Sequence, residues 1–219
     1  LSIMVNEEDH LRLQGLTAGW ALRDALRIAE EAEDAAPLRN AHAAPWGYLT
    51  ASPYNAGTAR RLSALFHLVA LGHSRQLPTA IRALSASGLV VRGIFGEVSR
   101  PVGAFVQVSW TGADVAPFLG AAEYLIELER KARAEFGDDE LRKLTQDVMR
   151  YAITQREIGL GDAFRVLAYA RWAAAATKPA AAREIDRLLS TLEISGRNDP
   201  AEAAIERAGF LRNFLEETL

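Results

Sequence analysis

The sequence contains no cysteine among its 219 residues. Disulfide bonds, thiolate metal ligands and a cysteine nucleophile are therefore excluded. The four histidines, at positions 10, 42, 67 and 73, do not have the spacing of metal ligands. A strong charge of one sign is also missing, because the net charge is −3, so we expect neither nucleic acid nor a membrane surface as a partner. No uninterrupted apolar run has the length of a membrane span, and we expect a cytoplasmic protein.

Hydrophobic residues make up 49% of the chain, enough for one sizeable core or two small ones. The sequence opens on Leu1 and passes directly into the apolar stretch Ile3-Met4-Val5. Natural domains rarely begin inside a strand, so we expect further residues upstream of Leu1.

Up to about Trp110 the hydrophobic pattern is mixed. Apolar residues at helical spacing predict helices over 20–33, 58–71 and 78–87, the last with Pro78 at a permitted first-turn position. Short apolar runs predict strands at 3–5, 47–51, 89–91 and 105–108, the last two as an antiparallel pair.

After Trp110 the strand pattern disappears. Segments rich in Ala, Leu, Arg and Glu predict helices over 114–135, 139–155, 161–176, 180–193 and 200–217. The last of these is expected to begin at Pro200, with Asp199 as its cap. We therefore predict an α+β fold, with an antiparallel sheet flanked by helices followed by an all-helical C-terminal subdomain. The expected domains are residues 1–110 and 111–219.

Three consecutive acids, Glu7-Glu8-Asp9, follow the first predicted strand and are closed by His10 and Arg12. Adjacent carboxylates repel one another, so they belong on a solvated turn or opposite a cation. An exposed polar turn ahead of a helix accounts for this pattern equally well.

Two further loops carry potential chemistry. Ser52-Pro53-Tyr54-Asn55-Ala56-Gly57 precedes the helix predicted from Thr58, whose first turn would hold Arg60 and Arg61 and could bind an anion. A capped helix with two solvated arginines is the alternative. Arg92-Gly93-Ile94-Phe95-Gly96-Glu97 reads either as a functional charge pair or as a hairpin whose glycines supply positive φ.

Together and in this order, these loops resemble the catalytic half of the ATP:guanido phosphotransferases, the family of arginine and creatine kinases. The matching segments are VNEEDHLR (5–12), GYLTASPYNAGT with Arg61 (47–61), GLVVRGIFGE (88–97) and VGAFVQVS (102–109). The resemblance implies that nucleotide-binding strands and a Ser-x-Arg-x-Arg motif precede this part of the fold.

The resemblance also implies a role for each loop. Glu8 and Glu97 would hold the substrate guanidinium and take its proton, because this planar cation with a pKa above about 12 is a poor nucleophile. Arg12, Arg61 and Arg92 would bind the phosphates of ATP. Ser52 and Asn55 would lie in the loop that closes beside the guanidinium. Magnesium would be held mainly through the nucleotide phosphates, with no metal site of the protein's own.

The helical tail resembles the bacterial protein-arginine kinases within this family. These enzymes phosphorylate arginine side chains and mark proteins for a Clp protease, so the implied partners are proteins with exposed arginines, a Clp chaperone-protease, an activator protein and a second copy of the chain. The matching tail segments are 125–133, 150–151, 170–171 and 206–212.

Some residues depart from the family pattern. Ser52 and Tyr54 stand in the loop where the family has Cys-Pro-Ser/Thr-Asn, and a serine hydroxyl lacks the negative charge of a thiolate. Residues 203–208 keep only Arg207 and Ala208 of the Arg-Asp-x-x-Arg-Ala motif that binds phosphoarginine in the protein kinases. Two alternatives to a protein-arginine kinase therefore stay open: a non-catalytic adaptor that binds arginine or phosphoarginine proteins, and a kinase of small guanidines.

Overall fold

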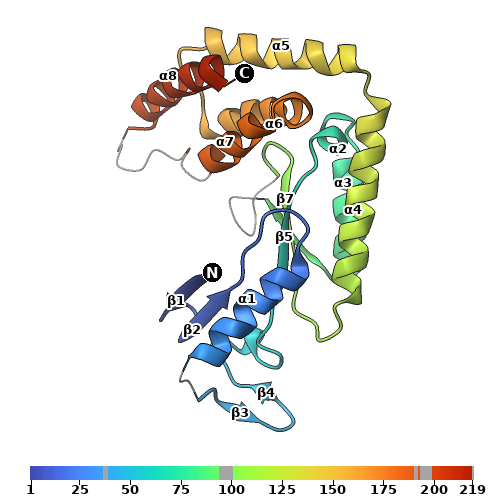
Figure 1. The fold of residues 1–219 in the computed structure, drawn as a ribbon, viewed down its shortest axis with the longest axis vertical. Helices are drawn as coiled ribbons and strands as arrows, with labels where there is room; N and C mark the ends of the chain where they lie inside the picture. The colour runs from blue at the N-terminus through green and yellow to red at the C-terminus, as the bar shows by residue number, and fades with distance from the viewer. Residues whose placement is uncertain (37–38, 94–100, 190–191, 193–198, 219) are drawn as a thin grey trace. The chain divides into compact units, whose positions relative to one another are not determined.

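The computed structural model describes residues 1–36, 39–93, 101–189, 192 and 199–218. The chain forms two compact units, one made of residues 1–62 with 111–115 and the other of residues 63–110 with 116–219. The domain division at residue 110 stays a prediction. The α+β fold with antiparallel strands and a helical C-terminal part is confirmed (Figure 1).

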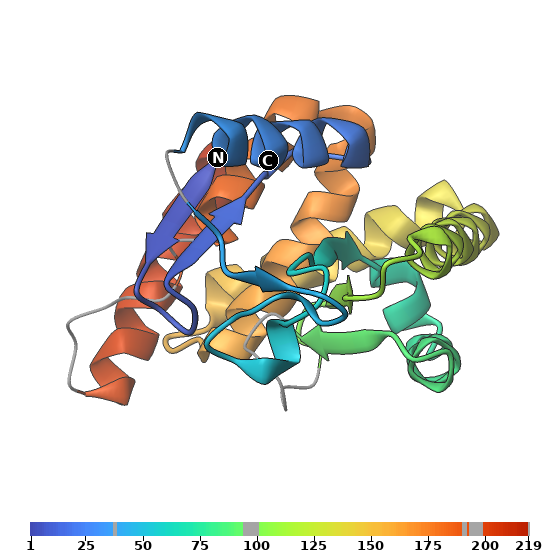
Figure 2. The same cartoon turned by 90° about the horizontal axis from the view of Figure 1, so that it is seen from below.

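The first unit begins with an antiparallel hairpin. Strand β1 (Ser2–Val5), which was predicted, pairs with β2 (Leu11–Gln14), which was not. Helix α1 (Leu22–Ala35) packs against β2 (Figure 2). The crossing between strand and helix is close at Gly15, where an added Cβ would lie 1.8 Å from the Ala25 carbonyl oxygen.

A second, smaller hairpin in this unit joins β3 (His42–Ala43) to β4 (Gly47–Tyr48). Strand β4 is shorter than the predicted 47–51, because the chain leaves it for a one-turn 3₁₀ helix, η1 (Pro53–Asn55). The predicted loop of turn-forming residues is therefore an ordered turn.

The second unit contains a three-stranded sheet in the order β5 (Leu62–His67), β7 (Phe105–Trp110), β6 (Val90–Gly93). Strands β6 and β7 are antiparallel, as predicted, with Val90 opposite Ser109 and Gly93 opposite Val106. Val106 and Val108 point to one face of β7 and are almost completely buried. This face lies in the core of the unit.

The prediction of a helix over residues 58–71 is wrong. The chain instead forms β5 followed by the short helix α2 (Val69–His73). Leu62 and Phe66 fit both periods and are buried, whereas Leu65, which only the helical period would bury, is 62% exposed. Pairing with the sheet therefore overrides the helical pattern.

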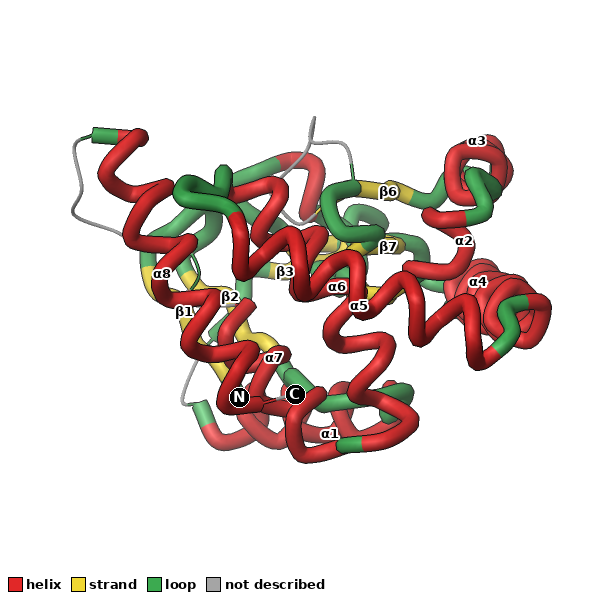
Figure 3. The backbone as a smooth tube through the Cα atoms, turned by 90° about the horizontal axis from the view of Figure 1, so that it is seen from above, coloured by secondary structure: helices red, strands yellow, loops and turns green. Residues whose placement is uncertain are grey.

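Helix α3 (Leu77–Ala86) follows α2 and begins with a proline in its first turn, as predicted. Figure 3 shows the C-terminal part as helices in red, and the described residues after β7 contain no strand. The five predicted tail helices are confirmed: α4 (Ala116–Glu135), α5 (Asp138–Thr154), α6 (Leu160–Thr177), α7 (Pro179–Leu189) and α8 (Pro200–Thr218). Of the predicted end of the fourth helix, residues 190, 191 and 193 lie outside the described residues.

The helices bury a core of their own. Helix α6 packs against α5, α7 and α8, and the side chains of Leu167, Ile185 and Leu211 are completely buried. Asp199 accepts a hydrogen bond from the Ala201 N–H at 2.8 Å, which confirms its expected role as the cap of α8. None of the helices that the structure describes combines the length and the apolar character needed to cross a lipid bilayer.

Candidate active site

The acidic turn is the connection between β1 and β2. The Asn6 N–H donates to the His10 carbonyl oxygen at 3.0 Å, and Asn6 has a φ of 54°, which asparagine tolerates better than most residues. This tight closure exposes Glu7 and Glu8, whereas Asp9 is half-buried. The predicted turn is confirmed, and its three carboxylates lie in different environments.

Arg12 is the second residue of β2, two residues past His10, where the turn ends. Its Nη1 atom lies 3.1 Å from Glu7 Oε2, and its Nη2 and Nε donate to Gln14 at 2.8 and 3.0 Å once the amide oxygen is turned toward the guanidinium. Side-chain exposures of 35% for Arg12 and 50% for Glu7 make this a surface ion pair, worth about 0–1 kcal/mol. A phosphate can therefore displace Glu7 at little cost.

The loop of residues 49–57 is held at both ends by β4. Tyr48 N–H donates to the Gly57 carbonyl at 2.8 Å, and the Gly57 N–H donates back to Tyr48 at 3.0 Å. Gly47 is required here, because its φ is +75° and an added Cβ would lie 2.5 Å from the Gly57 oxygen. Inside the loop, Thr50 Oγ1 donates to the Ser52 carbonyl at 2.6 Å, and the Asn55 N–H donates to the same oxygen at 3.0 Å.

Asp9 connects the acidic turn to this loop. Its Oδ1 accepts from the Ser52 N–H at 3.0 Å, and its Oδ2 accepts from Asn55 Nδ2 at 2.7 Å. The Ser52 backbone donor and then the Asn55 side chain lower the pKa of Asp9 below its ordinary value, because both stabilise the charged carboxylate. The sequence predicted a solvated turn for Asp9, and a contact across 43 residues leaves no local signal.

The structure thus brings Glu8, Arg12, Ser52 and Asn55 into one unit. Arg61 belongs to the same unit and is exposed, but it directly precedes strand β5. The expectation that Arg60 and Arg61 open a helix is therefore wrong, and the anion-binding argument from a helix start does not apply. Arg60 instead pairs with Glu30 of α1 at 3.1 Å.

The remaining predicted residues lie elsewhere. Arg92 is half-buried on β6 in the second unit, opposite Gln107 of β7. Glu97 lies outside the described residues. Tyr54 is 90% exposed, so its ring does not fill the space around Asn55.

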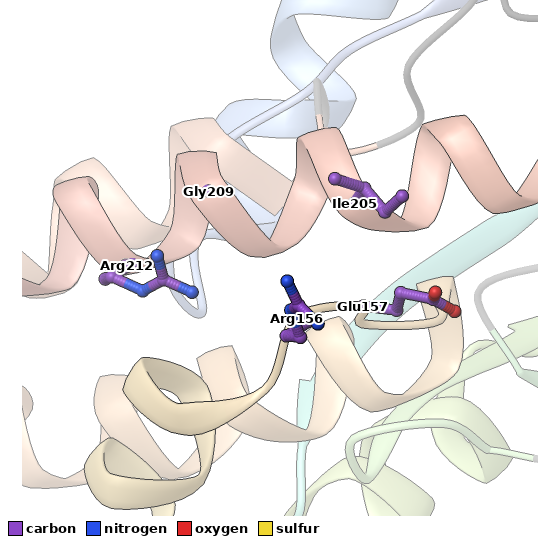
Figure 4. A pocket seen from close by; sticks show the side chains of 5 residues that line it. All are labelled: Arg156, Glu157, Ile205, Gly209 and Arg212. Atoms are coloured by element: carbon purple, nitrogen blue, oxygen red, sulfur yellow. The ribbon is translucent and has the colours of Figure 1, made fainter.

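A recess of about 510 Å³ lies in the helical part of the second unit. Figure 4 shows its lining, which comes from the loop after α5 and from α8: Arg156, Glu157, Ile205, Gly209 and Arg212. Arg212 donates to the carbonyls of Ile153 and Gln155 at 3.0 and 3.1 Å, so it satisfies carbonyl oxygens at the C-terminus of α5. Of the predicted catalytic residues, the three that the structure describes (Glu8, Ser52 and Asn55) do not line this recess.

Arg207, which matches the family's phosphoarginine motif, is 7% exposed. Its Nη1 donates to the Ile158 carbonyl at 2.9 Å, and the Ile158 N–H donates to the Ala204 carbonyl at 3.0 Å. In this chain Arg207 therefore fastens α8 to the connection between α5 and α6.

Residues 1–126 match the family model described as ATP:guanido phosphotransferase, C-terminal catalytic domain. The chain is 43% identical over 142 residues to a protein of Shouchella clausii named protein-arginine kinase, covering 61% of this chain and 40% of that protein. It is 37% identical over 183 residues to the protein-arginine kinase of Symbiobacterium thermophilum, covering 78% and 52%. The corresponding values for the Bacillus subtilis protein are 41% over 142 residues, 61% and 39%. The chain thus spans about half or less of the length of these relatives.

Proposed function

This chain belongs to the ATP:guanido phosphotransferase family, and we propose that it acts as a protein-arginine kinase. The reaction transfers the γ-phosphoryl group of ATP to the guanidinium of an arginine side chain in a protein. Because the chain covers only part of its relatives, this activity is proposed for the whole gene product that contains it.

The observation that carries the proposal is the extent of the match to the Symbiobacterium thermophilum protein-arginine kinase. That match covers 78% of the chain, whereas the catalytic-domain model ends at residue 126. The similarity therefore includes part of the helical tail as well as the catalytic loops. A kinase of small guanidines accounts for the loops but not for a tail shared with protein-arginine kinases.

The acidic turn supplies the chemistry of the attacking group. Glu8 is exposed at the tip of the turn, where its carboxylate can hold the guanidinium and accept one of its protons. As the guanidinium nitrogen forms its bond to the γ-phosphorus, the bond from that phosphorus to the bridging oxygen breaks and ADP leaves. Glu97 is proposed as the second carboxylate of the pair.

Arginines are proposed to bind the nucleotide phosphates. Arg12, Arg61 and Arg92 carry forked donors that suit phosphate oxygens, and the weak pair with Glu7 leaves Arg12 able to bind them. Among the described residues no three His, Cys, Asp or Glu side chains form a group suited to a metal ion. Magnesium is proposed to enter bound to ATP, where it would neutralise phosphate charge.

The wider setting follows from the same proposal. Substrates would be proteins with exposed arginines, and their modification would mark them for a Clp chaperone-protease. We also propose a cytoplasmic homodimer that works with an activator protein.

The experiment incubates the whole gene product with γ-labelled ATP and either an unfolded protein or free arginine. Acid-labile label on the unfolded protein supports the proposal. Label on free arginine alone overturns it in favour of a small-guanidine kinase. Binding of arginine-phosphorylated protein without any transfer overturns it in favour of the adaptor.

A further inference from the structure

Asp9 occupies a different position from the two acids beside it. Glu7 pairs with Arg12 on the neighbouring strand and Glu8 is exposed. Asp9 alone is half-buried, and each of its two oxygens accepts a hydrogen bond from the loop that carries Ser52 and Asn55.

The two donors lie at the two ends of η1. Ser52 immediately precedes this turn and Asn55 is its last residue. A carboxylate that accepts from both ends fixes the orientation of the turn as well as its position. Both hydrogen bonds stabilise the charged carboxylate and so lower the pKa of Asp9.

Ser52 makes these contacts through its backbone. Its N–H donates to Asp9, and its carbonyl accepts from Thr50 and from the Asn55 N–H. The connection to Asp9 is therefore independent of the side chain at position 52, and it is kept although serine stands where the family has cysteine.

We propose that Asp9 is a positioning residue that fixes the Ser52–Asn55 turn at a set distance from Glu8. Glu8 is its neighbour in the chain, so the carboxylate that takes the proton and the loop beside the guanidinium are tied together through one side chain. This inference rests on the proposed function and concerns the alignment of the guanidinium in the same site. Misplacement of a reacting group by about 1 Å can lower the rate by about a hundredfold.

The test compares Asp9→Ala and Asp9→Asn with the control Asp24→Asn. Asp24 is an exposed acid of α1 in the same unit that pairs with Arg27 at 3.7 Å, so the control removes the same charge without touching the loop. An asparagine at position 9 can accept from only one of the two donors and presents its own donor to the other. It therefore gives a milder variant if the alanine variant fails to fold.

Two measurements are made on each variant. The kcat for arginine phosphorylation is expected to fall by about tenfold to about a hundredfold in Asp9→Ala, with the KM for ATP changed by less than about twofold. Amide exchange at Ser52, followed by NMR, is expected to accelerate by at least about tenfold, because its acceptor is gone. Asp9→Asn should fall between Asp9→Ala and the wild type, and Asp24→Asn should match the wild type. A double variant, Asp9→Asn with Asn55→Asp, restores the donor–acceptor pair and should regain the Ser52 protection.

The outcomes separate the inference from the function on which it rests. A wild type with no transfer activity overturns the proposed function and this inference with it. An active wild type whose Asp9→Ala variant keeps its kcat overturns the positioning role alone, whatever the amide exchange shows. Unchanged exchange at Ser52 in Asp9→Ala overturns the connection itself. If Asp9→Ala failed to fold, amide exchange would rise throughout the chain and the KM for ATP would change. The kcat and the Ser52 exchange of Asp9→Asn would then test the positioning role.

Discussion

Replacement of Glu129 by alanine should strongly destabilise the second unit. Glu129 lies on α4 and is 6% exposed. Its Oε1 and Oε2 accept from the N–H groups of Ala70 and Leu71 at 3.1 Å each, and Oε1 also accepts from Arg133 Nε at 2.7 Å. Helix α2 has Leu68 in its cap position and no side-chain cap of its own, so a carboxylate nearly sixty residues further along the chain takes that role.

The magnitude follows from the groups left without partners. Alanine leaves two buried backbone N–H groups unsatisfied, at about 1–3 kcal/mol each. Arg133 is 30% exposed, so water can take over much of its lost interaction and adds little to the cost. We expect the free energy of unfolding to fall by about 3–5 kcal/mol, the range found when one partner of a buried pair is removed. For a chain of this size the melting temperature would fall by about 6–20 °C.

The assay is equilibrium unfolding in urea, with Glu129→Gln as a graded variant and Glu127→Ala as the control. Glutamine keeps one oxygen acceptor and should lose roughly half as much stability as alanine. Glu127 is exposed on the same helix, so its replacement should change the free energy by less than about 0.5 kcal/mol. A loss below about 1 kcal/mol for Glu129→Ala would show that the Ala70 and Leu71 N–H groups do not depend on this carboxylate.

Three further predictions concern other parts of the chain. Burial lowers the pKa of His67 to about 3, so below its ordinary pKa of about 6.5 only the unfolded chain binds the proton, and stability falls as pH drops from 6.5 toward 3. Between pH 7 and pH 5 the free energy of unfolding, measured in urea, should fall by about 2 kcal/mol more in the wild type than in His67→Gln. Equal falls in the two proteins would contradict the lowered pKa of His67. Gly47→Ala should lower the free energy of unfolding by at least about 1 kcal/mol more than Gly19→Ala in the same assay. Both glycines have positive φ, but only at Gly47 would an added Cβ meet a backbone oxygen. Equal losses in the two variants would exclude this clash. Ser52→Cys should raise kcat about tenfold, equivalent to about 1.4 kcal/mol of barrier, because a thiolate adds negative charge near the guanidinium, and an unchanged kcat would show that the missing thiolate does not limit the reaction.

Local patterns predicted most of the helices correctly. Half-buried residues at 22, 25, 26 and 29 of α1 follow the period of 3.6 that the sequence shows, and the tail helices end near their predicted breaks. Strand β5 was missed because its apolar residues fit both periods over a short run. Only the pairing with β7, which no local pattern contains, decides between them.

The candidate site was predicted as separate loops, and the contacts between them were not. The sequence marks Glu8 and Asn55 as members of two loops, but the hydrogen bonds of Asp9 depend on how the hairpin and the loop pack. Glu129 had a signal that was not used. It lies on the same helical face as Leu125 and Ala132, both buried, and an acid on an apolar face indicates a buried carboxylate with partners.

The most direct measurement of the central claim is the chemical identity of the phosphorylated residue. The whole gene product, as wild type and as Glu8→Gln, is incubated with ATP and an unfolded protein, and the modified sites are mapped by mass spectrometry under non-acidic conditions. We expect phosphate on arginine nitrogen, lost on acid treatment, and a fall of at least about a hundredfold in the rate of Glu8→Gln, the usual contribution of a general base. Phosphate on hydroxyl side chains, or arginine phosphorylation that Glu8→Gln leaves unchanged, would contradict it.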